Sequence, residues 1–262
     1  MHGTVGPPAE ARLRSETIDL LANRASVRKF QSVPVGVDMV EAVLRAGFRA
    51  PTSSNIQAYS VVVVRDAETK RRLSVVAGNQ KWVAETPVFL GFCADLTRIA
   101  AALEANGHSL AGNNMEVGLV SSIDAALVAM SAYLAAESLG LGGVCIGGVR
   151  NNAVEVAQIL GLPHRVYCVF GLCLGWPAEA PLQKPRMAYG AMVHHERYGA
   201  LAGGLDPATA LAGYDTTLAA HYTETGRKTT PDSWTHDMDK KFNPPLRDRL
   251  REELKQLGFD FR

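Results

Sequence analysis

The longest apolar stretch of the chain, Val117 to Leu139, constrains the fold more than any other feature. Its alanine-rich pattern and the glycine that follows predict one long helix. Ser121, Asp124 and Glu137 lie inside it, and a helix that crosses a lipid bilayer would hold these groups only at a high energetic cost. We therefore predict the buried helix of a soluble protein.

Composition places the chain among ordinary globular proteins, because 47% of its 262 residues are hydrophobic and 20% are charged. Lys and Arg number 27 and Asp and Glu 26, so no global field favours nucleic acid or an anionic membrane as a partner. The cysteines lie in apolar runs without a C-x-x-C pair, which predicts buried free thiols in a reducing cytoplasm. They are Cys93, Cys145, Cys168 and Cys173.

Helical and extended patterns alternate along the chain. Helices are expected at residues 17–21, 39–50, 66–76, 95–105, 117–139, 153–160, 207–225 and 245–257. Strands are expected at residues 59–64, 87–93, 144–146 and 166–174. The β-branched run Tyr59–Val64 predicts a central strand covered on both faces. The alternation favours an α/β or an α+β fold in which helices cover a sheet.

Glycines cluster at residues 140–148, in the run GLGGVCIGG. A Rossmann dinucleotide site places its glycines after a strand and at the start of a helix, whereas this run follows a helix and enters a strand. That order disfavours dinucleotide binding, and the P-loop motif is absent. Gly147 and Gly148 either let the backbone lie flat against a planar ligand or form a tight turn.

No motif indicates a metal site or nucleophilic catalysis. His194, His195 and Glu196 are adjacent, so their side chains diverge, and the helical zinc motif H-E-x-x-H does not occur. The nucleophile motif G-x-S-x-G does not occur either.

Two basic clusters are more informative. Arg24, Ser26 and Arg28 alternate along the chain, so an extended backbone would place all three side chains on one face. Lys184 and Arg186 repeat this spacing far downstream. The two clusters either converge on one phosphate through charge-assisted hydrogen bonds or are unrelated surface charges.

Together these segments resemble the FMN-dependent nitroreductase family, in its branch of oxygen-insensitive NADPH nitroreductases and NADPH–flavin oxidoreductases. The resemblance covers roughly residues 17–200 and depends on an ordered set of motifs. These are RASVRKF at 24–30, APTSSNIQAYS at 50–60, AGNQK at 77–81, AESLGLGGVCIGGVRN at 136–151, FGLCLGWP at 170–177 and KPR at 184–186.

The resemblance implies an α+β fold with a central, mostly antiparallel sheet wrapped by helices. It further implies an intertwined homodimer that binds FMN at the subunit interface. On this basis residues 15–200 are expected to form the FMN-binding nitroreductase domain. The aperiodic, Gly- and Pro-containing residues 1–14 are expected to be a flexible lead-in, and residues 201–262, which show helical patterns, a helical C-terminal arm of the same domain.

The same resemblance assigns roles to residues that match the family's motifs. Arg24 and Ser26 are expected at the FMN phosphate, with Lys184 and Arg186 approaching from the other side. Arg28 is expected at the N1/O2 edge of the flavin ring, where it tunes the flavin. The other expected FMN contacts are Gln80 at the pyrimidine end, the backbone N–H groups of Gly147 and Gly148 at N5 and O4, Cys145 and Ile146 beside the ring, and Thr52, Ser53, Ser54 and Asn55 from the partner subunit.

The implied activity is a two-electron exchange in two steps, in which NAD(P)H reduces the flavin and an acceptor then reoxidises it. The acceptors are nitroaromatics, quinones, chromate-like oxidants or free flavin. FMN carries the chemistry, so no catalytic side chain is expected. NADPH is the expected donor, NADH is an alternative, and Arg227 and Lys228 are candidates for the extra phosphate. The alternatives are a flavin reductase that supplies free reduced FMN to another enzyme, and a flavin-binding protein without turnover.

Overall fold

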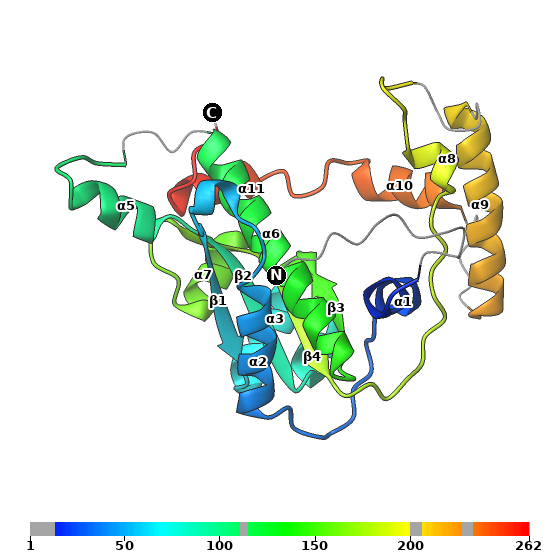
Figure 1. Cartoon of the computed structure of the whole chain (residues 1–262), viewed down its shortest axis with the longest axis horizontal. Coiled ribbons are helices and arrows are strands. Elements are labelled where there is room, and N and C mark those ends of the chain that lie inside the picture. The colour runs from blue at the N-terminus through cyan, green and yellow to red at the C-terminus, as the bar shows by residue number, and fades with distance from the viewer. Residues whose placement is uncertain (1–13, 111–114, 200–205, 227–232, 262) are drawn as a thin grey trace, which may run out of the picture.

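A four-stranded sheet forms the centre of the computed structural model, which describes residues 14–110, 115–199, 206–226 and 233–261 (Figure 1). The strands lie in the order β1 (Tyr59–Val64), β2 (Val88–Asp95), β4 (Val166–Gly175) and β3 (Gly142–Ile146). Every neighbouring pair is antiparallel, so the α+β expectation is confirmed and the α/β option is wrong. The order of elements along a chain does not specify the direction in which strands pair, because a helical connection can also return to an antiparallel neighbour.

The run Tyr59–Val64 does form a strand, but its predicted central position is wrong. β1 is an edge strand that pairs with β2 alone, and Val63 is 41% exposed. An apolar run indicates that both faces of a strand are partly covered by other elements. It does not indicate whether the strand lies at the centre or at the edge of the sheet.

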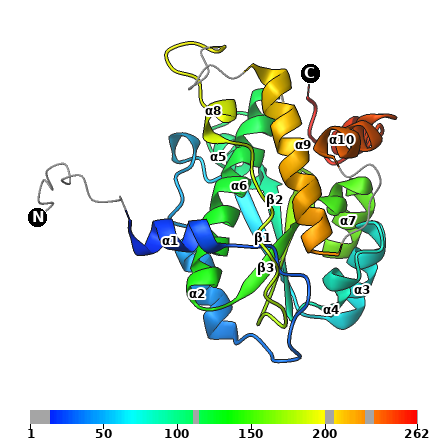
Figure 2. The ribbon, with the colours of Figure 1, turned by 90° about the vertical axis from the view of Figure 1, so that its right-hand side faces the viewer.

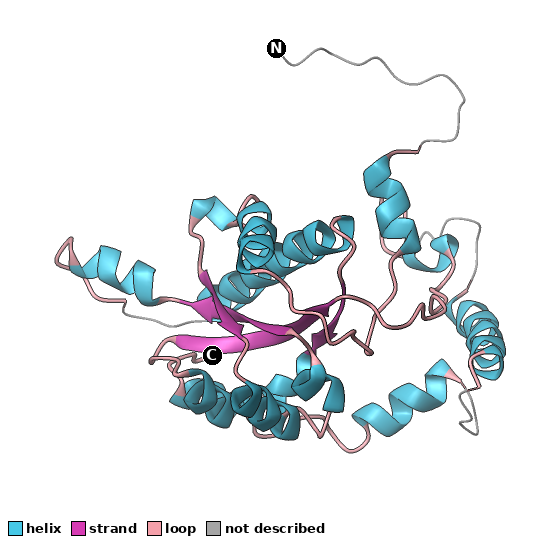
Figure 3. Ribbon diagram, turned by 90° about the horizontal axis from the view of Figure 1, so that it is seen from below, coloured by secondary structure: helices cyan, strands magenta, loops and turns pink. Residues whose placement is uncertain are grey.

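Helices cover both faces of the sheet (Figure 3). One face packs against α2 (Val37–Gly47) and α6 (Met115–Ser138), and the other packs against α3 (Ala67–Val76) and α7 (Ala153–Leu160). Successive residues of β2 alternate between these two cores: Leu90 joins the α6 side and Phe89 the α3 side. The remaining helical elements are α1 (Glu16–Asn23), η1 (Ser53–Asn55), α4 (Lys81–Glu85), α5 (Thr97–Glu104), η2 (Gly147–Asn151), α8 (Tyr189–Met192), α9 (Pro207–Glu224), α10 (Trp234–Phe242) and α11 (Leu250–Gln256).

α6 is the long apolar helix that the sequence predicts. Its length and hydropathy would suffice to cross a membrane, but it packs against the sheet and α2 and buries the carboxylate of Asp124. We therefore identify it as a core helix of the fold. The expectation of a buried helix is confirmed for the face that packs against the sheet, whereas the other face of α6 exposes a stripe of large apolar side chains. The stripe comprises Met115, Leu119, Ile123, Leu127 and Met130.

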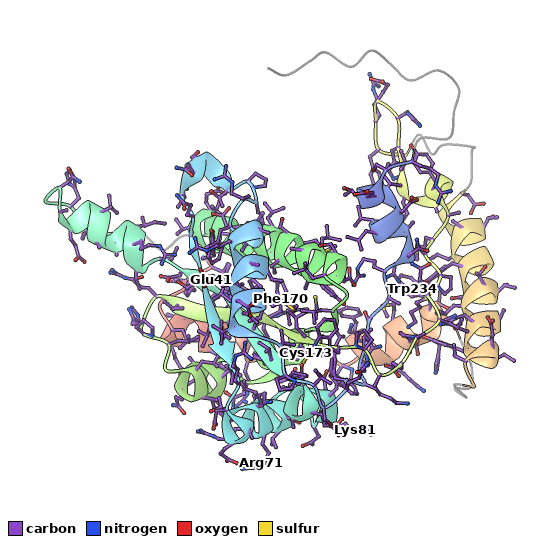
Figure 4. All side chains as sticks on the ribbon, turned by 60° about the horizontal axis from the view of Figure 1, so that its bottom comes forward. Glu41, Arg71, Lys81, Phe170, Cys173 and Trp234 are labelled. Carbon is purple, nitrogen blue, oxygen red and sulfur yellow. The ribbon has the colours of Figure 1, made fainter. Side chains whose placement is uncertain are left out.

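The C-terminal residues divide into two parts. α9 and α10 lie to one side of the sheet together with α1 and α8 (Figures 1 and 2). Figure 4 labels Trp234 in this region and Cys173 in the sheet. α11 returns to the sheet side, where Leu254 and Phe259 join a core with Tyr167 of β4. We call the first part the α9–α10 pair.

The four cysteines are free thiols. Cys93, Cys168 and Cys173 are buried, as predicted, whereas Cys145 is exposed. The prediction for Cys145 is wrong because alternate residues of β3 face opposite sides, and the flanking Val144 and Ile146 occupy the buried side.

Asp95 at the end of β2 is 5% exposed and holds a polar cluster between β1 and α5. Its carboxylate accepts hydrogen bonds from Thr97 Oγ1 at 2.6 Å, from Arg98 at 3.1 Å and from the hydroxyl of Ser60. Burial by itself raises the pKa of Asp95, but these hydrogen bonds and the Arg98 charge outweigh burial and lower it.

Candidate functional site

A cavity of about 1060 Å³ lies between the segment that follows α1 and the end of α9. This volume is at the upper end for small-molecule and cofactor sites. The cavity is lined by Leu21, Ala22, Arg24, Ala25, Ser26, Arg28, Trp82, Pro181, Leu182, Gln183, Lys184, Pro185, Arg186, His221, Tyr222 and Thr225. The two basic clusters singled out in the sequence therefore meet at one cavity.

The first cluster is extended because it lies along the free edge of β3. Ser26 forms a parallel bridge with Gly143, and the Val27 amide donates to the Gly143 carbonyl at 2.9 Å. Val27 is 6% exposed and faces the core, whereas Arg24, Ser26 and Arg28 line the cavity. The alternation in the sequence thus predicts the shared face.

Arg24 has partners that the sequence analysis did not name. Its Nε donates to Glu137 Oε2 of α6 at 3.3 Å, and its guanidinium lies 4.6 Å from the centroid of the Tyr133 ring. Burial tends to lower the pKa of Arg24, but Tyr133 and Glu137 outweigh it and raise that pKa. Burial also raises the pKa of Glu137, whose side chain is only 9% exposed. Arg24 is thus a cation held in place by α6 at the wall of the cavity.

The second cluster, Lys184 to Arg186, is tied to the first by the chain segment before it. The Ala178 amide donates to the Lys29 carbonyl at 2.9 Å, and Gln183 Nε2 donates to the Arg24 carbonyl at 2.9 Å. The Glu179 carboxylate accepts the Arg28 amide at 2.9 Å. These contacts bring the two clusters together although about 160 residues separate them.

The cavity wall is strongly cationic. Two cations come from the first cluster and two from the second, and the wall contains no Asp or Glu within the described parts of the chain. Arg28 lies 5.8 Å from the centroid of the Trp82 ring, and no carboxylate pairs with its side chain among the described residues. Four positive charges around one cavity suit a ligand with a terminal phosphate.

Gly148 packs closely against Gln80, the residue expected at the flavin pyrimidine. A Cβ on Gly148 would lie 2.3 Å from the Ala77 carbonyl oxygen and 2.7 Å from Gln80 Nε2, so no side chain fits there. Gln80 Nε2 donates to the Ala77 carbonyl at 2.6 Å. The nearest atom to a Cβ on Gly147 would be Arg150 Nη2, at 3.4 Å. Gly148 and Gln80 are therefore neighbours, although neither lines the cavity.

The other two expected ring neighbours differ from each other. Ile146 is 1% exposed in the core on the α3 side of the sheet, whereas Cys145 is exposed on β3. Neither residue lines the cavity.

The loop from Thr52 to Asn55 does not line the cavity either. It lies beside the first half of α6, where both oxygens of Asp124 act as acceptors. Oδ1 accepts the Ser53 amide at 3.0 Å, and Oδ2 accepts the Ala58 amide at 3.2 Å. Ser53, Ser54 and Asn55 are exposed, so the loop is held in a defined shape with its side chains in solvent.

Several residues at the site carry no signal in the sequence. Tyr222 lines the cavity from α9, and Asp124 shapes the loop. Arg247, in the segment before α11, donates from Nη2 to the Gly147 carbonyl at 3.1 Å and from Nε to Asn151 at 3.1 Å. Each lies in a segment without a recognisable motif, so only the fold identifies it. Arg227 and Lys228 lie outside the described residues.

Comparisons with known proteins identify the family and the fold. The sequence model of the nitroreductase family matches residues 21–176, and the model of the C-terminal domain of that family matches residues 184–262. The chain is 37% identical over 245 residues to an oxygen-insensitive NADPH nitroreductase of Salmonella typhimurium, covering 94% of this chain and 98% of the relative. It is 35% identical over 248 residues to an FMN reductase (NADPH) of Bacillus subtilis, covering 94% and 99%. The solved structure of B. megaterium NfrA2 superimposes with a TM-score of 0.89 at 32% identity, covering 95% of this chain and 100% of that one.

Proposed function

Because the chain belongs to the nitroreductase family, we propose that it is an FMN-dependent NAD(P)H oxidoreductase that reduces nitroaromatics, quinones or related acceptors. The observation that carries the proposal is the single cavity at which Arg24, Arg28, Lys184 and Arg186 converge. The names of similar proteins, a nitroreductase and an FMN reductase that both use NADPH, support the same reaction class.

The residues present fit FMN. The terminal phosphate carries about two negative charges, which matches a wall of four cations without a carboxylate among its described residues. When bound, FMN supplies the redox chemistry by accepting two electrons from NAD(P)H and delivering them to the acceptor. The chain itself binds and orients FMN. We assign Ser26 and the cations Arg24, Lys184 and Arg186 to the phosphate. We assign Arg28, Gln80, Gly147 and Gly148 to the flavin ring, and we place Cys145 and Ile146 beside the ring.

The test of this function is the bound chromophore and the acceptor range. The purified protein is expected to be yellow and to release FMN rather than FAD on denaturation. NADPH oxidation should be faster with nitrofurazone or a quinone than with oxygen alone. A colourless protein that does not bind added FMN would refute the proposal, and fastest turnover with free FMN would favour the flavin reductase alternative.

We also propose that the active form is a homodimer, in which the loop Thr52–Asn55 completes the FMN site of the partner subunit. Two observations support this. The apolar stripe of α6 is 39–54% exposed in the single chain, which is a large apolar face for a soluble protein. The loop lies beside the first half of the same helix, is shaped by Asp124, and does not reach the cavity of its own chain.

A charge in the stripe should therefore disrupt the dimer and weaken flavin binding. Ile123→Glu is expected to give a monomer with weakened FMN affinity. Val75→Glu on α3 is the matched control, since Val75 is 53% exposed and Ile123 is 54% exposed, but α3 lies on the other face of the sheet. Light scattering and flavin titration measure both properties, and a monomeric wild type that binds FMN would exclude the shared site.

Donor preference and location complete the proposal. We propose NADPH as the preferred donor, because the two relatives described above use it by name. Arg227→Ala/Lys228→Ala should then raise the KM for NADPH more than that for NADH. A cytoplasmic location is supported by four free thiols, three of them buried, which a reducing compartment preserves.

A further inference from the structure

A chain of three polar side chains begins at the cavity and runs into the α9–α10 pair. Lys184 lines the cavity, and its Nζ donates to the hydroxyl of Tyr222 at 3.0 Å. The Tyr222 hydroxyl in turn donates to Oδ2 of Asp237 at 3.0 Å. The three residues come from three segments: the loop before α8, α9 and α10. Two partly buried hydrogen bonds thus link the phosphate side of the cavity to the C-terminal helices.

The chemistry of the three groups decides which of them donates and which accepts in each hydrogen bond. An ammonium group has donors and no acceptor, and a carboxylate has acceptors and no donor. The hydroxyl between them must therefore accept from Lys184 and donate to Asp237. Hydrogen bonds in series polarise one another, so the negative charge of Asp237 makes the tyrosine oxygen a better acceptor for the ammonium.

Tyr222 is well suited to hold the ammonium in one place. The side chain is 1% exposed, so its hydroxyl has little freedom to move. Lys184 Nζ also lies 5.0 Å from the centroid of the Tyr222 ring, within the range of a cation–π contact. A lysine side chain has a long flexible stem, and fixing its end in advance reduces the entropy lost on binding a ligand.

The helices that carry Tyr222 and Asp237 behave as one unit with the second basic cluster. Tyr214 of α9 donates its hydroxyl to the Pro185 carbonyl at 3.0 Å, so the backbone beside Lys184 is held as well. Asp215 of α9 accepts hydrogen bonds from Thr235 of α10 at 3.1 Å from N and 2.6 Å from Oγ1. Hydrogen bonds thus join α9 to α10 and join α9 to the cavity wall.

We propose that Tyr222 and Asp237 are positioning residues that set the affinity of the cavity for a phosphate-bearing flavin by fixing the ammonium of Lys184. The proposal deepens the function proposed above and depends on it, because it assumes that the cavity binds FMN through its phosphate. It gives the α9–α10 pair a share in distinguishing FMN from riboflavin, beside the residues that contact the phosphate directly. The isoalloxazine ring is the same in both molecules, so its binding is independent of this network.

The test compares the two flavins on the apoprotein. Tyr222→Phe should raise the Kd for FMN about tenfold, because a hydrogen bond to a charged group is lost. The Kd for riboflavin should change by less than about twofold. Asp237→Asn keeps an acceptor for the hydroxyl but removes the charge, so it should give a smaller shift in the same direction. Circular dichroism shows whether Tyr222→Phe is folded. If it is not, the Kd values of Asp237→Asn test the proposal in its place.

A double-variant cycle tests whether Tyr222 acts through Lys184. Lys184→Met alone should weaken FMN binding at least as much as Tyr222→Phe. In the Lys184→Met background, Tyr222→Phe should then have no further effect on the Kd for FMN. Tyr189→Phe is the control, since that tyrosine is 69% exposed on α8 and does not line the cavity.

Each outcome has one meaning. If the wild type binds FMN tightly and Tyr222→Phe leaves the Kd unchanged, the positioning role is refuted and the proposed function stands. Equal weakening of FMN and riboflavin, or additive effects in the double variant, would show that Tyr222 only supports the fold. A wild type that does not prefer FMN to riboflavin would refute the proposed function itself.

Discussion

Removing the carboxylate of Asp124 tests how α6 shapes the loop that we place at the partner's FMN site. The side chain is 1% exposed and accepts the amides of Ser53 and Ala58 through its two oxygens. Between these amides, three non-glycine residues adopt positive φ: Ser54 at 47°, Asn55 at 56° and Gln57 at 54°. Such conformations persist only where the surrounding structure holds them.

The magnitude follows from the two amides. Ala58 is 1% exposed, so its amide would lose its acceptor without gaining water, at a cost of about 1–3 kcal/mol. The Ser53 amide belongs to an exposed residue that water can reach, so its loss is closer to about 0.5–1.5 kcal/mol. We expect Asp124→Ala to lower the free energy of unfolding by about 3 kcal/mol. Asp124→Asn should cost about half of this, since its single oxygen still accepts one amide.

Urea unfolding at one fixed protein concentration measures this loss, because a dimer's stability depends on concentration. Glu116→Ala, an exposed change on the same helix, is the control and should stay within about 0.5 kcal/mol of the wild type. The FMN affinity of Asp124→Ala should fall as well, because the loop no longer keeps its shape. A loss below about 1 kcal/mol together with unchanged FMN affinity would refute the reasoning.

Three further predictions concern the site and the response to acid. Gly148→Ala should weaken FMN binding and lower the free energy of unfolding by about 1–3 kcal/mol, because the new Cβ would lie 2.3 Å from a backbone oxygen. Gly147→Ala should lower it far less, and equal losses would contradict the packing argument. Arg28→Ala should lower the midpoint potential of bound FMN in spectroelectrochemical titration, with Arg28→Lys intermediate, and an unshifted potential would remove Arg28 from the tuning of the flavin. Because the pKa of Asp95 is lower in the folded state, the stability it contributes is present above about pH 4 and is lost as the pH falls through the folded value. Asp95→Asn should therefore flatten the acid side of the unfolding free energy against pH, and an unchanged slope would count against this assignment.

Local patterns of residue types predicted most helices and strands with good accuracy. Ser15 caps α1 and Asn152 caps α7, each by accepting an amide of the first turn, at 3.2 Å and 3.1 Å. Gly161, with φ of 65°, ends α7 at the boundary expected for this helix. The alternation of Arg24, Ser26 and Arg28 predicted their shared face correctly. These features depend on neighbours a few residues away, and the spacing of residue types records such interactions directly.

The sequence did not determine how those elements meet. β1 lies at an edge rather than at the centre, one face of α6 remains exposed in the single chain, and Cys145 is outside the core. The short helices α4, α8 and α10 were not expected either. Each of these features depends on which elements pack together. An apolar pattern predicts that a surface is buried, but it does not identify the element that buries it.

The site shows the same division. The two basic clusters were visible as spacing, and the family resemblance proposed that they share one phosphate. The fold brings them to one cavity, and it alone decided that Glu137 holds Arg24, that Asp124 shapes the loop, and that Tyr222 and Asp237 hold Lys184. These contacts join residues 15 to 113 positions apart in the chain, so local patterns carry no trace of them. Tertiary packing creates them because buried polar groups must find partners wherever the topology places them.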